Sequence, residues 1–318
     1  MQIGLIQIDG ELPNLALMKL SAWHKSKGDY VCLMRSDVVS TRLIPFDKVY
    51  ISCIFEENAG KAISLQKQFR NAEIGGIGVN CAILPNEIEH IKPDYSLYNI
   101  DYSMGLTTRG CLRKCPFCKV PIAEGIIRAN CDIYEFWDSK HKHIVLLDNN
   151  ILALPQHFKK IATQINTEKL SVDFNQGLDI RLLNENNAKI LSGLRIKPNL
   201  RFAFDSMEIE PQVLKGIGLL QKFDMLDHTM WYVLVGYNTT IEQDLHRLNL
   251  LKSYKQKPYV MRYKTVKGQK IYNDLSSWAN QKQFFASMDF DTFRKCRENR
   301  ELVIPKPKAN GNAKLSTT

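Results

Sequence analysis

Three cysteines stand close together before the middle of the chain. Cys111, Cys115 and Cys118 lie in the run TTRGCLRKCPFC, with the spacing C-x-x-x-C-x-x-C. Thiolates are the protein ligands of iron–sulfur clusters, and a short loop with three of them binds three irons of a cubane while the fourth iron has no protein ligand. Open coordination positions distinguish catalytic metal sites from closed structural ones. The loop is therefore predicted to hold a cluster that performs chemistry.

With Phe117 directly before the last cysteine, the loop resembles the signature of the radical S-adenosylmethionine (SAM) superfamily. The resemblance implies a [4Fe–4S] cluster on Cys111, Cys115 and Cys118, SAM chelating the fourth iron, and Phe117 among the cofactor-binding residues. In that family, reductive cleavage of SAM yields a 5′-deoxyadenosyl radical that abstracts hydrogen from a substrate. The resemblance also implies an electron-donor protein such as flavodoxin or ferredoxin. In such enzymes the cofactors supply the radical, and the protein supplies position and excludes water.

A structural zinc site or a redox pair is the alternative interpretation of these cysteines. Zinc requires a fourth ligand, for which Cys131, His141 and His143 are candidates. Structural zinc sites usually contain two short ligand pairs, and this stretch holds a single C-x-x-C pair, so the spacing favours the cluster. A non-catalytic iron–sulfur or zinc protein that binds nucleic acid stays open as an alternative function.

The elements around this loop indicate an α/β protein. Residues 96–275 are predicted to form a partial (β/α)6 radical SAM barrel, after a smaller Rossmann-like domain at 1–95 and before a C-terminal helical segment and disordered tail at 276–318. The six barrel strands are expected in the runs SMGLTT, HIVLLDN, LSVDFNQ, LRFAFD, TMWYVLVG and YVMRYK. Active sites of such barrels lie at the carboxyl ends of the strands.

Polar residues follow the second and third of these strands. Asp148 and Asn149 are candidates to accept hydrogen bonds from the ammonium group of SAM, with turn or cap residues as the alternative. Asn175 lies in the next polar segment. Arg181 is a candidate partner of the SAM carboxylate through two parallel hydrogen bonds, and a salt bridge with Asp179 is its alternative.

Three further cofactor-binding candidates follow the later strands. The resemblance implies that Asp205 accepts the ribose hydroxyls and that Gly236 and Glu242 belong to the loosely defined adenine contact. The alternative is a helix cap, in which one of residues 238–240 caps the helix of IEQDLHRL and Glu242 lies in its first turn. Both interpretations are compatible.

The first hundred residues alternate between expected strands and helices, which predicts a parallel sheet. This segment resembles the cobalamin-binding domain that precedes the radical core in many members of the superfamily. The D-x-H-x-x-G ligand motif of that domain has no counterpart here, because residues 9–14 after the first strand contain no histidine. Cobalamin binding through that motif is therefore not expected, although other binding modes stay open.

The same segment resembles the N-terminal domain of the tRNA methylthiotransferases, which carry a second cluster. Cys53 and Cys81 occupy two of the three ligand positions, but Asp9 and Gly10 stand at the first, and Cys32 lies inside the second strand. The alternative is that these cysteines pack as small apolar side chains. A methylthiotransferase-like enzyme is thus an alternative function, although no RNA-binding β-module is recognised near the C-terminus.

Composition is consistent with a cytoplasmic enzyme. The 318 residues include eight cysteines, and the sequence contains no apolar run of membrane-spanning length and no signal peptide at its start, so we expect reduced thiols and no membrane partner. The 43 Lys and Arg residues exceed the 33 Asp and Glu residues, for a net charge of +10, which makes nucleic acid a candidate partner. The aromatic run at 284–293 is expected to form a covering helix.

Overall fold

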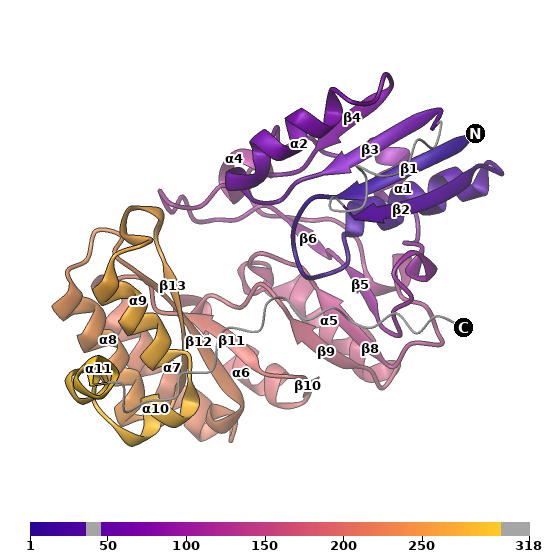
Figure 1. Cartoon of the computed structure of the whole chain (residues 1–318). Coiled ribbons are helices and arrows are strands. Elements are labelled where there is room, and N and C mark those ends of the chain that lie inside the picture. The colour runs from indigo at the N-terminus through magenta and orange to yellow at the C-terminus, as the bar shows by residue number, and fades with distance from the viewer. Residues whose placement is uncertain (36–45, 300–318) are drawn as a thin grey trace. The chain divides into compact units, whose positions relative to one another are not determined.

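The computed structural model describes residues 1–35 and 46–299, and it separates into two compact units, Met1–Leu200 and a second that begins at Arg201. Both units combine helices with parallel sheets, which confirms the predicted α/β class (Figure 1). The division falls inside the segment 96–275 that the sequence predicts as one barrel. The predicted tail lies largely outside the described residues. In the described part of the chain, no helix has the length and apolar character needed to cross a membrane.

The first sheet lies at the start of the first unit and has the parallel order β2-β1-β3-β4. Its strands are β1 (Gln2–Gln7), β2 (Tyr30–Arg35), β3 (Lys48–Ser52) and β4 (Ala72–Gly75), and its helices are α1 (Leu15–Ser26), α2 (Ala59–Gln66) and α3 (Asn86–Glu89). Ile3 and Leu5 pack with Leu17 of α1, whereas Ile6 packs with Ala62 of α2. Because successive side chains of a strand point to opposite faces, the two helices cover the two faces.

The second sheet of this unit has the parallel order β10-β9-β8-β5. It consists of β5 (Ser103–Gly105), β8 (His143–Leu146), β9 (Ser171–Phe174) and β10 (Arg195–Ile196), with α5 (Pro155–Thr167) and α6 (Glu185–Ser192) following β8 and β9. The hairpin of β6 (Thr108–Arg109) and β7 (Arg128–Ala129) encloses α4 (Val120–Ala123) and the cysteine loop. Leu15 and Met18 of α1 pack with Met104 and Val145, which joins this sheet to the first one.

The second unit contains one parallel sheet of order β11-β12-β13. Its strands are β11 (Leu200–Ala203), β12 (Thr229–Val235) and β13 (Lys257–Arg262), and its helices are α7 (Glu210–Lys222), α8 (Ile241–Ser253), α9 (Lys270–Ala279), α10 (Lys282–Ser287) and α11 (Phe290–Glu298). Strands therefore form at all six positions where barrel strands are expected. Within the described residues, β5, β8 and β9 share a sheet with β10, which was not expected, and β11, β12 and β13 form another sheet.

The aromatic run near the C-terminus is buried inside the second unit. Trp278 of α9 packs against Phe285 and Phe290, with ring centroids 4.9 and 5.6 Å apart, and Phe284 packs against Phe293 at 5.3 Å. All four phenylalanines are buried. Apolar residues at helical spacing thus mark the buried face of α10 and α11, as expected, and their rings are not a surface on which bases stack.

Short 3-10 helices connect several of these elements. They span Glu56–Asn58, Tyr95–Leu97, Ile133–Glu135, Ile151–Ala153, Ile180–Leu182, Met207–Ile209, Leu226–His228 and Lys264–Val266.

Candidate functional site

The cysteine loop begins at a glycine that no other residue replaces without strain. Gly110 has a φ of +82°, and a Cβ atom there would lie 2.5 Å from the Ile126 carbonyl oxygen and 2.6 Å from that of Gly125. The backbone nitrogen of Cys111 donates to the Gly125 carbonyl at 3.1 Å. This close approach of backbone to backbone closes the segment between β6 and β7 into one loop.

All three cysteines of the loop are half-buried, and none of them forms a disulfide bond. Burial raises the pKa of Cys118, and the neighbouring charges of Cys115 and Cys111 raise it further, so the three thiols lie within electrostatic range of one another. The Cys118 nitrogen donates to the Cys115 carbonyl at 2.9 Å, and the Arg113 nitrogen lies 3.4 Å from the Cys111 sulfur. Over residues 1–35 and 46–299, no three His, Cys, Asp or Glu side chains are grouped closely enough to hold a metal ion.

One buried carboxylate fastens this loop to the end of β9. Asp179 accepts from Arg113 Nε at 2.9 Å, and from Arg181 Nε and Nη2 at 2.6 and 3.0 Å. Burial opposes ionisation of Asp179, but hydrogen bonds from Arg181 and Arg113 outweigh it and hold the pKa of Asp179 below its ordinary value. The salt bridge that was the alternative interpretation of Arg181 is therefore present.

Arg181 also lies beside the cysteine loop. Burial lowers its pKa, but the hydrogen bonds and charge of Asp179, and then the thiolate of Cys115, outweigh burial and raise it. Two arginines share one carboxylate at this point, so the Arg113–Asp179–Arg181 group carries one net positive charge next to the thiols. Such a charge stabilises anionic sulfur.

A second carboxylate, Glu124, holds the other end of the loop. Its Oε2 atom accepts from the Gly110 nitrogen at 2.8 Å and from Asn149 Nδ2 at 2.9 Å, and its Oε1 atom lies 3.5 Å from Arg109 Nη1. Asn149 follows β8, so Glu124 connects the start of the loop to the carboxyl end of a strand. The structure thus brings Asn149 to the loop.

Asp148, the other candidate for the SAM ammonium group, points into the protein interior. It is almost completely buried and accepts from the Thr107 nitrogen at 3.2 Å, from the Thr107 hydroxyl at 2.7 Å and from the Thr108 hydroxyl at 2.6 Å. Burial raises its pKa, although these hydrogen bonds oppose that shift. These contacts are those of a turn residue that holds the strand before the loop, which was the alternative interpretation of Asp148.

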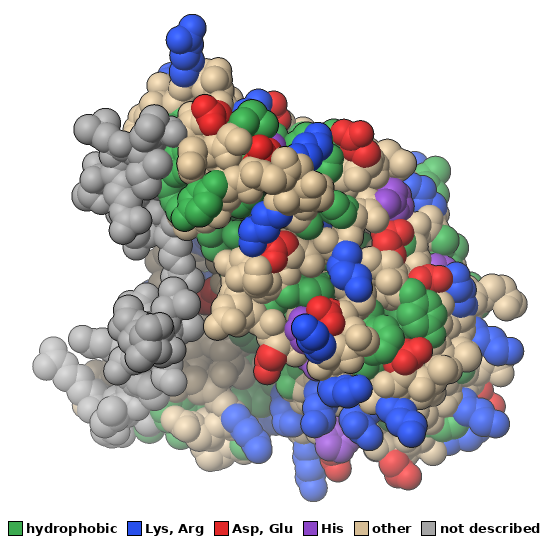
Figure 2. Space-filling model, turned by 90° about the vertical axis from the view of Figure 1, so that its right-hand side faces the viewer, with side chains coloured by type: hydrophobic (Ala, Val, Ile, Leu, Met, Phe, Trp, Pro, Cys, Tyr) green, Lys and Arg blue, Asp and Glu red, His purple; other side chains and the backbone are tan. Residues whose placement is uncertain are grey.

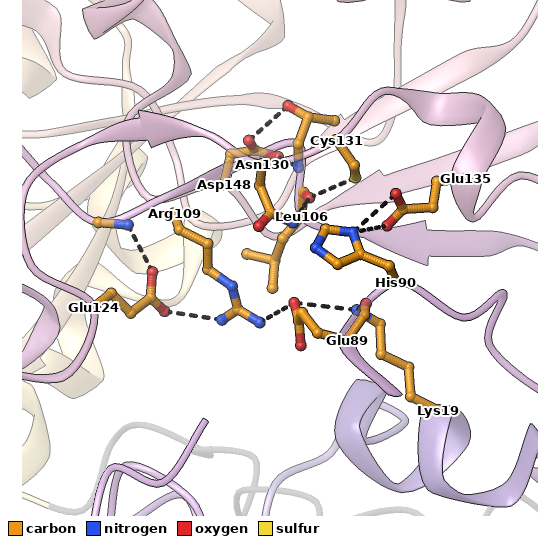
Figure 3. A network of polar contacts seen from close by, with 12 residues as sticks. Lys19, Glu89, His90, Leu106, Arg109, Glu124, Asn130, Cys131, Glu135 and Asp148 are labelled. Carbon is orange, nitrogen blue, oxygen red and sulfur yellow. Dashed lines mark hydrogen bonds and ion pairs between the residues drawn. The ribbon is translucent and has the colours of Figure 1, made fainter. Parts of the chain in front are cut away.

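A chain of ion pairs with little exposure to solvent starts at Arg109, directly before the loop (Figure 3). Arg109 pairs with Glu89, which also pairs with Lys19 of α1 at 3.2 Å between Nζ and Oε1. Burial opposes ionisation of Glu89, but Lys19 and Arg109 outweigh it and lower the pKa of Glu89. Sequence reasoning missed Lys19, Glu89 and Glu124, because a lone charged residue in a helix or turn does not reveal a distant partner.

The candidate fourth zinc ligands have other partners. The Cys131 sulfur donates to the Leu106 carbonyl at 3.1 Å, and burial raises the pKa of Cys131 to about 12. His141 Nδ1 lies 2.9 Å from the Ser103 hydroxyl, and His143 Nδ1 lies 2.9 Å from that of Ser171.

Two other candidates of the first unit lie around the loop. Phe117 is half-buried within it. Asn175 is half-buried at the carboxyl end of β9, where its backbone nitrogen donates to the Leu146 carbonyl at 3.0 Å. Gly177, with a φ of +87°, turns the chain there toward Asp179.

The remaining candidates belong to the second unit. Asp205 Oδ1 accepts from the Leu234 nitrogen at 2.8 Å, and Gly236, with a φ of +74°, donates from its nitrogen to Asp244 Oδ2 at 3.0 Å. Thr240 caps α8 in a capping box with Gln243, and Glu242 lies in the first turn. The predicted helix cap is confirmed.

The cysteines of the first sheet have a more apolar setting. Cys53 is fully buried in the core beside Cys32, and burial together with nearby Asp9 raises its pKa to about 11. Its sulfur lies 3.5 Å from Asp9 Oδ2, and Asp9 also accepts from the Ile54 nitrogen at 2.7 Å. Cys81 is half-buried at a φ of +54° in the turn after β4. Packing accounts for Cys53 and Cys32, as the alternative interpretation expected.

No protein-family model matches this chain, and neither does any curated protein. A function is therefore inferred from the residues and their geometry.

Replacing Gly110 with alanine tests the closure of the loop. Its Cβ would meet two carbonyl oxygens, so we expect a loss of more than about 2 kcal/mol in the free energy of unfolding, measured by urea denaturation. Gly125→Ala is a matched control, because Gly125 also has a positive φ, +76°, but no atom within 4 Å of the added Cβ. Equal losses in the two variants would show that the close approach at Gly110 is unimportant.

Replacing Glu89 with glutamine tests the buried ion pairs. Since the pKa of Glu89 is lowered, its contribution to stability is present above its unfolded pKa and is lost as the pH falls through the folded value. At pH 7, the free energy of unfolding of the variant should be about 3 kcal/mol lower than that of the wild type. On acidification below about pH 4.3, the free energy of unfolding should decrease less in the variant than in the wild type. Glu87→Gln, at an exposed position of α3, is the control. Parallel acid curves for wild type and Glu89→Gln would contradict this role.

Proposed function

We propose that this chain is a radical SAM enzyme that acts on a substrate still to be identified. The observation that carries the proposal is the C-x-x-x-C-x-x-C spacing of Cys111, Cys115 and Cys118, three half-buried cysteines in a loop that hydrogen bonds tie to the segments after the parallel strands β8 and β9. We propose further that β5, β8, β9, β11, β12 and β13 are the strands of the partial barrel of such an enzyme.

The residues present fit a [4Fe–4S] cluster in donor type and in charge. Three thiolates bind three irons, and the remaining iron is left for the amino and carboxylate groups of SAM. A cluster with three thiolate ligands is anionic. The net positive charge of the Arg113–Asp179–Arg181 group next to Cys115 therefore favours its binding.

When bound, the reduced cluster supplies the electron that cleaves SAM to methionine and the 5′-deoxyadenosyl radical. The chain's own residues hold the site. Glu124 fixes the loop at Gly110, Asp179 fixes it at Arg113, and Asp148 holds the two threonines that lead into it. Their hydrogen bonds keep the loop against the sheet, which restricts access of water to the sulfur atoms.

Asn149 is the candidate of the first unit that we propose for the SAM ammonium group. Its amide nitrogen donates to Glu124, which directs its carbonyl oxygen to act as the acceptor. Asn175, Phe117 and Arg181 surround the same loop and are proposed to complete the contacts with SAM from this unit. Asp205, Gly236 and Glu242 are proposed for the nucleoside. An electron-donor protein and a cytoplasmic location belong to the same proposal.

The direct test is anaerobic reconstitution followed by iron and sulfide analysis. We expect about four irons and four sulfides per chain, and almost none in Cys115→Ala, because the loss of one of three ligands prevents stable cluster binding. Cys296→Ala is the control, since this half-buried cysteine lies on α11 in the second unit. Addition of SAM should change the electron paramagnetic resonance spectrum of the reduced cluster.

Three results would have different meanings. Zinc without sulfide in the wild-type protein would overturn the proposal. A second cluster that persists in Cys115→Ala and is lost in Cys53→Ala would indicate the methylthiotransferase-like alternative. An electron paramagnetic resonance spectrum that does not change on addition of SAM would show that the cluster lacks the proposed open iron.

A further inference from the structure

The strands of the second sheet all begin at one edge, and that edge is basic. In the register of this sheet, His143 of β8 pairs with Ser171 of β9, which pairs with Arg195 of β10. Because the strands are parallel, these residues lie at the amino-terminal edge, opposite the edge that carries the cysteine loop. The inference from this edge goes beyond the proposed function and does not depend on it.

Five exposed cations gather on the segments around these strand starts. No salt bridge within the described residues involves any of the five, which we call the basic edge: Lys140, Lys142, Lys169, Arg195 and Lys197. Figure 2, which shows the right-hand side of the molecule as drawn in Figure 1, has frequent Lys and Arg side chains on its lower part. Part of the excess positive charge of the chain is therefore located at the basic edge.

The acidic residues nearby are fewer. Asp101 is exposed, whereas Asp173 is buried beneath the edge. Glu168 is half-buried and accepts from the Tyr134 hydroxyl at 3.0 Å, and Asp138 accepts from the Lys140 backbone nitrogen at 3.0 Å. Positive charge thus remains in excess.

The basic edge contains an open hollow of about 590 Å³, lined by His143, Ser171, Lys197 and Pro198. The His143 Nδ1 atom and the Ser171 hydroxyl lie 2.9 Å apart at its wall, and the ring of Tyr102 contacts that of His143 with centroids 6.2 Å apart. The hollow thus offers an ammonium group, a hydroxyl and an imidazole. Groups of these types contact phosphate oxygens and sugars in nucleic-acid complexes.

The surroundings favour nucleic acid over an acidic protein. None of the large exposed hydrophobic side chains of the described chain belongs to the segments 139–143, 168–171 and 194–198. Stable protein interfaces have an apolar core, whereas the affinity of nucleic-acid interfaces comes largely from phosphate contacts. Neighbouring strands are about 4.8 Å apart, which places the cations at their starts within reach of successive phosphates.

We propose that the basic edge binds the phosphate backbone of a nucleic-acid strand. The test measures binding of a fluorescein-labelled single-stranded RNA of about 20 nucleotides by fluorescence anisotropy, with the full chain, between about 50 and 300 mM KCl. In the variant Lys142→Gln/Lys169→Gln/Lys197→Gln we expect at least about tenfold weaker binding at 100 mM salt and a slope of log K against log salt smaller by about 2, since each lost phosphate contact removes about 0.7.

The control variant Lys215→Gln/Lys255→Gln/Lys282→Gln loses the same charge at exposed positions of the second unit. It should retain the affinity and slope of the wild type. Equal losses in the two variants would show that net charge alone attracts the RNA, and no binding by the wild type would refute the proposal. A labelled poly-glutamate that binds as tightly as the RNA, and equally depends on the basic edge, would identify a docking surface for an acidic protein and overturn it.

Discussion

Carboxylates that are buried or half-buried hold the cysteine loop, and the rest of the candidate site depends on them. Asp179 joins the loop to the end of β9, and Glu124 joins it to the end of β8. Glu89 joins the strand before it to α1. A buried ion pair contributes little net stability, but removal of one partner costs about 3–5 kcal/mol because the other charge stays buried. The loop is thus held in one position by groups that are costly to separate, which suits the cluster site that we propose.

The local features of the protein were predictable from its sequence, and its distant ion pairs were not. Alternating runs placed the strands, and residues 238–240 together with Glu242 marked the start of α8, because a helix cap depends on a few adjacent residues. The salt bridge between Asp179 and Arg181 could be predicted for the same reason, because the two residues are close together in the sequence. Lys19 and Glu89 are 70 residues apart in the chain, so only the packing of α1 against α3 reveals their pairing.

Charge is divided between the two edges of the second sheet. At the carboxyl edge, two arginines are paired with the one buried carboxylate of Asp179 beside the thiols, whereas at the amino edge the lysines are exposed and lack ion pairs in the described chain. The parallel topology produces both edges, since all strands of the sheet end on one side and begin on the other. The spacing of the cysteines predicted a functional site at the carboxyl edge. Net charge alone did not locate the amino edge, because the lysines of the basic edge come from segments far apart in the chain.

Radical SAM activity is tested most directly by the formation of 5′-deoxyadenosine from SAM. The protein is reconstituted anaerobically and reduced with dithionite, and the product is quantified by chromatography, with Cys118→Ala as the matched variant. We expect product from the wild-type protein and none from the variant. A wild-type protein with a full cluster that neither cleaves nor binds SAM would not be a radical SAM enzyme.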